Sequence, residues 1–134
     1  MRNATSIKKY MLYTALVLVS GHVKADWTVL EKNNNATDYV DTANIRRSGN
    51  TVQMWDLSDF ATPQSAGGYV FSSMLTLMEY DCTAKRSRKL QLTVFSGNMQ
   101  KGKVEGNVTL GDKAEWSYVL PNSRGESMLA VACK

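Results

Sequence analysis

The stretch YVFSSMLTLMEYDC, which runs from Tyr69 to Cys82, decides the fold because it is apolar on both sides of an extended chain. Side chains in a strand point alternately to opposite faces of the sheet. One face of this segment carries Tyr69, Phe71, Leu75 and Leu77, and the other carries Val70, Met74, Met78 and Tyr80. Since a strand of this kind is normally covered on both faces, we predict a central, covered strand here.

Shorter segments on either side of this stretch show the two-residue alternation of half-buried strands. The clearest case is Leu90, Leu92 and Val94, which alternate with Gln91 and Thr93. Similar segments, each bounded by turn-forming residues, are Trp27–Glu31, Thr37–Asp41, Thr51–Leu57, Lys103–Leu110 and Glu115–Leu120. The pattern predicts an antiparallel sheet of about six strands.

The periodicity changes after Pro121, where the sequence becomes typical of a helix. Ser123 and Glu126 have the spacing of a capping box. Leu129, Ala132 and Cys133 then fall on one helical face. We therefore predict an α+β fold, in which a C-terminal helix packs on the antiparallel sheet.

Cys82 and Cys133 are the only cysteines in the chain. In an oxidising compartment, an even pair in a small domain usually closes into a disulfide. A redox-active or metal-binding pair is the alternative, but the spacing is neither Cys-x-x-Cys nor that of a zinc site. We expect one disulfide, which would join the end of the central strand to the helix.

The amino-terminal region has the layout of a secretory signal peptide. Basic residues precede an apolar run from Tyr10 through Val19, and a small-residue region ends at Ala25. The apolar run is about half as long as a membrane-spanning helix requires. We predict a signal peptide at residues 1–25, cleavage before Asp26, and one domain at residues 26–134; an uncleaved membrane anchor is the alternative.

The net positive charge of the chain comes from this leader. The formal net charge is +4 for the whole sequence, but Arg2, Lys8, Lys9 and Lys24 all precede Asp26, which leaves the domain with equal numbers of basic and acidic residues. A neutral domain gives no electrostatic reason to expect nucleic acid or an anionic membrane as partner.

The domain also lacks the residues that most enzymes use. The only histidine, His22, lies in the predicted leader, so the domain has no imidazole for acid–base chemistry or metal binding. The segment from Gly97 to Val104 resembles a phosphate-binding loop, but Val104 stands where the loop needs a hydroxyl to hold magnesium. We interpret it as a hairpin connection and expect no enzymatic activity and no cofactor.

Four cations, Lys85, Arg86, Arg88 and Lys89, stand within five consecutive residues shortly after Cys82. We expect them on an exposed turn. A solvated surface is the ordinary interpretation of such a run, and attraction to an acidic polysaccharide or an acidic protein surface is the functional one. They are the candidate ligand patch.

Two further groups of residues have a structural and a functional interpretation. Asp38, Asp41, Asp56 and Asp59 flank predicted turns without the spacing of a calcium loop, so we expect turn capping and no metal site. Large aromatic residues on the strands of a small domain usually form its core. We favour that interpretation for Trp27, Trp55 and Trp116, and a ligand groove is the alternative.

Taken in order, several landmarks of this chain resemble the surface-adhesin protein E family of Gram-negative bacteria. They are Trp27, Tyr39-Val40-Asp41, the segment from Ile45 to Trp55, Glu79-Tyr80-Asp81-Cys82, the segment from Phe95 to Met99, Pro121 and Cys133. The resemblance implies an antiparallel sheet with a helix packed across it and an exported or outer-surface location. For adhesive members, it also implies binding to host extracellular-matrix proteins and assembly as a homodimer.

The chain lacks the lipid-carrying cysteine that would hold an adhesin on the outer membrane, so we expect no stable membrane anchor. Two functions therefore remain open at the level of sequence. One is a secreted adhesin that serves cell adhesion by binding extracellular-matrix protein or acidic polysaccharide. The other is a soluble structural or accessory protein of the periplasm.

Overall fold

The computed structural model describes residues 24–134. The predicted leader lies almost entirely outside the described residues. Within residues 24–134, no helix is long and apolar enough to cross a membrane.

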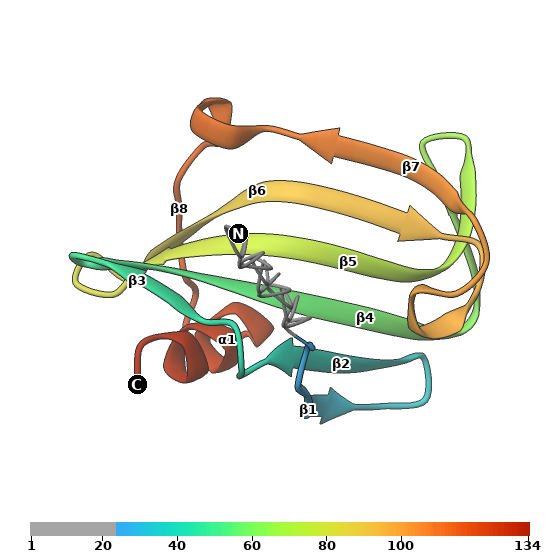
Figure 1. The fold of residues 1–134 in the computed structure, drawn as a ribbon. Coiled ribbons are helices and arrows are strands. Elements are labelled where there is room, and N and C mark those ends of the chain that lie inside the picture. The colour runs from blue at the N-terminus through green and yellow to red at the C-terminus, as the bar shows by residue number, and fades with distance from the viewer. Residues whose placement is uncertain (1–23) are drawn as a thin grey trace, which may run out of the picture.

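The described chain forms one antiparallel sheet of eight strands, with one α-helix at its C-terminal end (Figure 1). The elements are β1 (Trp27–Lys32), β2 (Ala36–Asp41), β3 (Arg46–Ser48), β4 (Thr51–Ala66), β5 (Tyr69–Asp81), β6 (Arg86–Phe95), η1 (Asn98–Gln100), β7 (Val104–Thr109), η2 (Gly111–Lys113), β8 (Ser117–Tyr118) and α1 (Arg124–Ala132). The main strand order is β1-β2-β4-β5-β6-β7, while β3 pairs with β4 and β8 pairs with β6. This arrangement confirms the predicted α+β class.

Strand β5 lies between β4 and β6, as its apolar character predicts. We also expected both faces of β5 to be covered. This prediction is wrong, because Leu75 and Leu77 are only half-buried.

Strand β4 continues nine residues beyond the predicted end at Leu57, because a register shift between Asp59 and Gln64 accommodates Pro63. Proline has no N–H to donate, so strands tolerate it at such irregularities. The segment after Phe95 is a hairpin connection between β6 and β7, as predicted.

The hydrophobic core lies between α1 and one face of the sheet. Six residues from β2, β4, β5 and α1 are almost fully buried together: Val40, Val52, Met54, Tyr80, Met128 and Ala132. The hydroxyl of Ser123 accepts a hydrogen bond from the backbone N–H of Glu126 (3.2 Å), which caps the first turn of α1. This contact confirms the predicted helix start.

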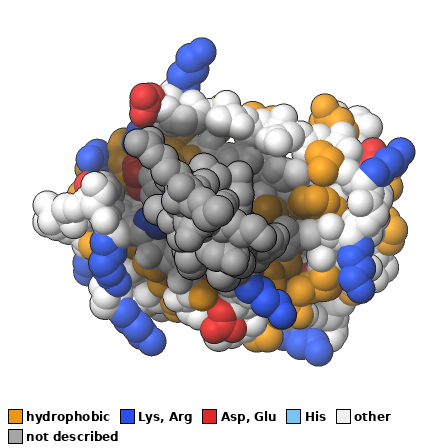
Figure 2. Space-filling model, in the orientation of Figure 1, with side chains coloured by type: hydrophobic (Ala, Val, Ile, Leu, Met, Phe, Trp, Pro, Cys, Tyr) orange, Lys and Arg blue, Asp and Glu red, His pale blue; other side chains and the backbone are white. Residues whose placement is uncertain are grey.

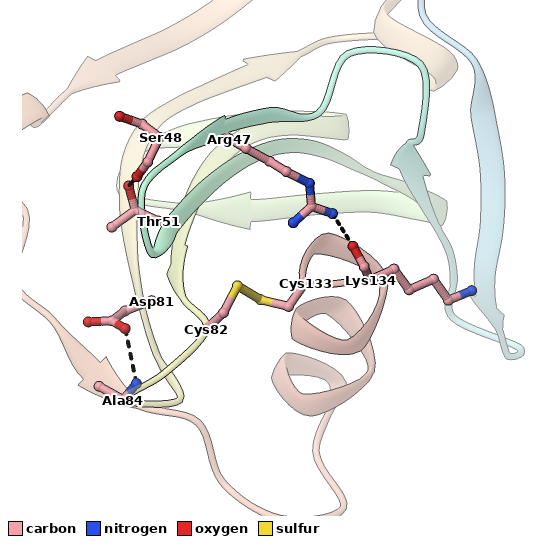
Figure 3. The surroundings of a disulfide bond; sticks show 8 residues. All are labelled: Arg47, Ser48, Thr51, Asp81, Cys82, Ala84, Cys133 and Lys134. Carbon is pink, nitrogen blue, oxygen red and sulfur yellow. Dashed lines mark hydrogen bonds between the residues drawn. A yellow bond between two sulfur atoms is a disulfide. The ribbon is translucent and has the colours of Figure 1, made fainter.

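The disulfide Cys82–Cys133 fixes the other end of α1 (Figure 3). It joins the turn after β5 to the residue that follows the helix, across 51 residues of sequence. Arg47 of β3 also donates a hydrogen bond to the backbone carbonyl of Lys134. The C-terminal end of α1 is therefore tied to the sheet by a covalent bond and a polar contact.

At the first turn of α1, Arg124 makes the corresponding attachment. Its guanidinium group donates to both carboxylate oxygens of Asp38 (2.9 and 3.1 Å), to Asp56 (3.2 Å) and to Ser58 (3.3 Å). Asp56 is only 2% exposed, and its burial raises its pKa to about 6, although the Arg124 guanidinium acts to lower it. Asp38 and Asp56 therefore anchor the helix, whereas the sequence led us to expect turn capping.

Candidate functional site

The face of the sheet opposite α1 is the candidate site, and we call it the open face. Strand alternation defines it: Val40, Met54 and Tyr80 point towards α1, so their neighbours Asp41, Trp55 and Glu79 point the other way. The single α-helix of residues 24–134 covers the other face. Some side chains on the open face, such as Leu57, Asp41 and Glu79, are buried, and others, including Trp55, are only half-buried.

All three tryptophans lie outside the buried core, contrary to the interpretation favoured from the sequence. Each is half-buried. Trp27 and Trp55 line a cavity of about 370 Å³, which we call the tryptophan pocket; its lining is Ala25, Trp27, Asp41, Asn44, Arg46, Trp55, Leu75 and Gln100. The structure thus favours the alternative interpretation, in which tryptophans line a groove.

Trp116 lies on the same face and contacts two arginines. The guanidinium carbons of Arg86 and Arg88 stand 4.8 and 4.5 Å from its ring centroid. Arg86 pairs with Asp81 (3.1 Å), and Arg88 pairs with Glu79 (2.7 Å). A cation over an indole face is attracted by the ring quadrupole, so this cluster of five side chains, the Trp116 cluster, is ordered before any ligand arrives.

The hydrogen bonds around Asp81 show how the turn before β6 supports this cluster. The backbone N–H of Ala84 donates to Asp81 Oδ1 (3.0 Å), and Arg86 Nε donates to Oδ2 (3.1 Å). The Ala84 hydrogen bond is the main cause that lowers the pKa of Asp81, and Arg86 adds to it. The carboxylate therefore stays ionised and keeps Arg86 beside Trp116.

The four cations of the predicted ligand patch are not brought together in one exposed turn. Only Lys85 lies in the turn; Arg86, Arg88 and Lys89 belong to β6. Because side chains alternate along a strand, Lys89 points to the opposite face, where it lines a smaller cavity with Asp56 and Arg124. Figure 2 shows Lys and Arg side chains spread around the outline of one face of the molecule.

The other two aspartates singled out in the sequence accept hydrogen bonds from nearby loops. Asp41, which is 3% exposed, accepts from the backbone N–H groups of Asp26 and Ala43 and from the side-chain amide of Asn44. Asp59 accepts from the backbone N–H of Met99 (2.8 Å). Asp41 thus holds a turn as predicted, and the carboxylate of Asp59 orders η1 at the edge of the tryptophan pocket.

The comparisons with known proteins agree with this architecture. The family model described as surface-adhesin protein E matches residues 27–134. The chain belongs to the surface-adhesin protein E family. No curated protein sequence matches it.

Solved structures show the same fold at low sequence identity. The selenomethionine form of Haemophilus influenzae protein E is 12% identical, with a TM-score of 0.61 over 84% of this chain and 88% of that chain. A second crystal form of the same protein is 13% identical, with a TM-score of 0.60 over 84% of this chain and 90% of the other. The family's fold is therefore retained although most side chains differ.

Proposed function

We propose that this chain is an exported, non-enzymatic binding module that attaches to host extracellular-matrix proteins through its open face. Membership of the surface-adhesin protein E family supports an adhesin-like role. One structural observation points to the face: all three tryptophans and two ordered arginines lie on it, outside the core. Tryptophan and arginine are enriched among the residues that dominate protein–protein binding energies.

The Trp116 cluster suits this role because it is built before binding. Arg86 and Arg88 are already held by Asp81 and Glu79, so a partner does not have to order two long side chains. Immobilising such side chains costs roughly 0.5–1.5 kcal/mol each on association. A preformed cluster avoids much of this cost.

The test compares cation substitutions on the two faces of β6. Purified exported protein is applied to immobilised fibronectin, laminin and collagen, with Arg86→Gln and Lys89→Gln as matched single-charge variants. Arg86→Gln should weaken binding about tenfold, because the Trp116 cluster loses a stacked cation. Lys89→Gln should leave binding unchanged, because Lys89 points to the opposite face.

Equal binding by both variants would contradict the assignment of the open face. Surface exposure is tested separately, by antibody labelling and protease treatment of intact cells of the native host. Protein confined to the periplasm, with no affinity for any matrix protein, would favour the periplasmic accessory function.

A further inference from the structure

We propose that the tryptophan pocket binds one or two sugar rings of an acidic polysaccharide. The inference rests on the proposed function, because it names the chemistry that one part of the open face recognises. Sugar rings present C–H groups on their faces and hydroxyl groups around their edges. A pocket that suits them combines flat aromatic surfaces with fixed hydrogen-bonding groups.

The aromatic part of the pocket comes from Trp27 and Trp55. They stand on β1 and β4, on either side of β2, and both border the same cavity of about 370 Å³. That volume lies within the usual range for small-ligand sites. An indole offers a large apolar face and an N–H donor at its edge, which matches the two kinds of surface on a sugar ring.

The polar part is fixed by a buried carboxylate. Asp41 Oδ2 accepts a hydrogen bond from Asn44 Nδ2 (2.6 Å), and Asp41 Oδ1 accepts from two backbone N–H groups. Asn44 therefore has a fixed orientation in which its carbonyl oxygen is left to accept from another donor. Asp41 is a positioning residue, because its own oxygens are already engaged.

Gln100 is held in the pocket by a backbone conformation that non-glycine residues rarely adopt. Met99 and Gln100 have φ values of 52° and 62°, a left-handed conformation that costs roughly 1 kcal/mol or more per residue. The N–H of Gln100 donates to the buried hydroxyl of Ser73 (3.0 Å), and that hydroxyl donates to the carbonyl of Gly97 (2.7 Å). The contacts fix the backbone and leave the Gln100 carboxamide for a ligand.

Arg46 gives the pocket its preference for acidic sugars. It lines the pocket from β3, is exposed, and forms no ion pair in the part of the chain that the structure describes. Three N–H donors already engage the Asp41 carboxylate, so the Arg46 guanidinium is the charged group in the pocket lining that remains free to pair with a ligand. A guanidinium pairs with carboxylate or sulfate in a bidentate geometry.

An acidic peptide is the other occupant to consider, and the geometry favours it less. Extended peptides usually gain affinity by adding to an unpaired strand edge. Although β1 and β3 each have an unpaired edge, the pocket lies on the face of the sheet, and its lining includes Trp55 and Leu75 from the inner strands β4 and β5. A site on the face of a sheet suits a ring with hydroxyl groups better than a peptide that adds to a strand edge.

The experiment titrates the purified exported protein with three oligosaccharides and monitors tryptophan fluorescence and calorimetry. The probes are a hyaluronan hexasaccharide, which carries carboxylates, a heparin hexasaccharide, which also carries sulfates, and the neutral cellohexaose. Both acidic probes should bind saturably and quench the fluorescence, and cellohexaose should bind about tenfold more weakly. If only heparin binds, sulfate is the group that Arg46 recognises.

Two variants on the same strand give the matched control. Arg46→Gln should lower the affinity for the acidic probes about tenfold and leave cellohexaose unchanged. Arg47→Gln should have no effect, since Arg47 reaches the carbonyl of Lys134 at the end of α1. Gln100→Ala should weaken all three probes about threefold. All three substituted side chains are exposed or half-buried, so the variants should fold, and melting temperatures verify this.

The inference is overturned if no hexasaccharide binds saturably, if the Arg46 and Arg47 variants lose equal affinity, or if a hexaglutamate peptide binds as tightly as hyaluronan. Matrix-protein binding is measured on the same samples. Intact matrix binding without saccharide binding would refute this inference alone. Saccharide binding without matrix binding would refute the proposed protein partner alone.

Discussion

The two faces of the sheet are built from different kinds of residue and different kinds of contact. The face under α1 carries apolar side chains such as Val52 and Met54, which pack against Met128 and Ala132 of the helix. The open face carries tryptophans, arginines and acids held by stacking and ion pairs. The covered face therefore holds the main hydrophobic core, whereas the open face combines the buried Leu57 with half-buried tryptophans and ion-paired arginines.

The largest expected effect comes from detaching α1 from the sheet. Replacing Cys82 and Cys133 by Ala opens a loop of about 50 residues and should destabilise the protein by about 4 kcal/mol. At roughly 4–8 °C per kcal/mol for a domain of this size, the melting temperature should fall by well over 10 °C. Calorimetry of wild type and variant measures the difference, and non-reducing peptide mapping verifies the bond. An unchanged melting temperature would show that packing alone secures the helix.

A pair of truncations compares the two faces directly. Met54 is 0% exposed beneath α1, so Met54→Ala should cost about 3 kcal/mol through lost burial and a cavity. Leu77 is half-buried on the open face, so Leu77→Ala should cost about 1 kcal/mol. Denaturant unfolding measures both free energies. Equal losses would mean that the open face contributes to the core as much as the covered face does.

The polar contacts of Asp56 at the start of α1 should make the stability of the protein depend on pH. Since the pKa of Asp56 is raised from 3.8 to about 6 by burial, the folded protein binds a proton there more tightly than the unfolded chain. The free energy of unfolding should therefore rise as the pH falls from about 7 towards 5, by about 1–2 kcal/mol. The variant Asp56→Asn should lose this dependence. A wild-type stability that falls over the same range, to the same extent as the variant's, would contradict the assignment.

These regions also show how far the sequence could predict the structure. Alternating and helical periodicity located β5, β7 and α1, because each pattern reports burial along one local element. The anchor of α1 was not predictable, since Arg124 is 86 residues from Asp38 and 68 from Asp56. The basic run was misplaced because four adjacent cations look like one patch in sequence, whereas strand alternation separates Lys89 from Arg86 and Arg88. The tryptophans were expected in the core because the sequence does not show whether an aromatic side chain on a strand is buried under the helix or half-buried on the open face.

A smaller effect on stability is expected at Asp26, the first residue after the predicted cleavage site. The backbone nitrogen of Asp26 lies 3.0 Å from Asp41 Oδ1, and this carboxylate is buried. If the leader is cleaved before Asp26, the new α-ammonium group replaces a neutral N–H donor there. Hydrogen bonds between charged partners are stronger than those of a neutral donor, so protein that begins at Asp26 should be about 1 kcal/mol more stable than protein that begins with an additional Met. Amino-terminal sequencing and unfolding of the two forms test this, and a retained leader would refute the cleavage site.

The smallest effect on stability should come from the two lysines of the basic run. Lys85 and Lys89 are exposed and form no ion pair within the described residues, and exposed charges contribute little to stability. Lys85→Ser combined with Lys89→Gln should shift the melting temperature by no more than about 1–2 °C. Arg86→Gln combined with Arg88→Gln should cost about 1–2 kcal/mol, because Glu79 and Asp81 lose their partners and Trp116 loses both stacked cations. The two arginines would then differ from the two lysines, because the arginines would contribute both to stability and to ligand contact. Equal melting temperatures for the two double variants would show that the stacked arginines are as dispensable as the lysines, and the distinction between an ordered open face and an ordinary solvated surface would fail.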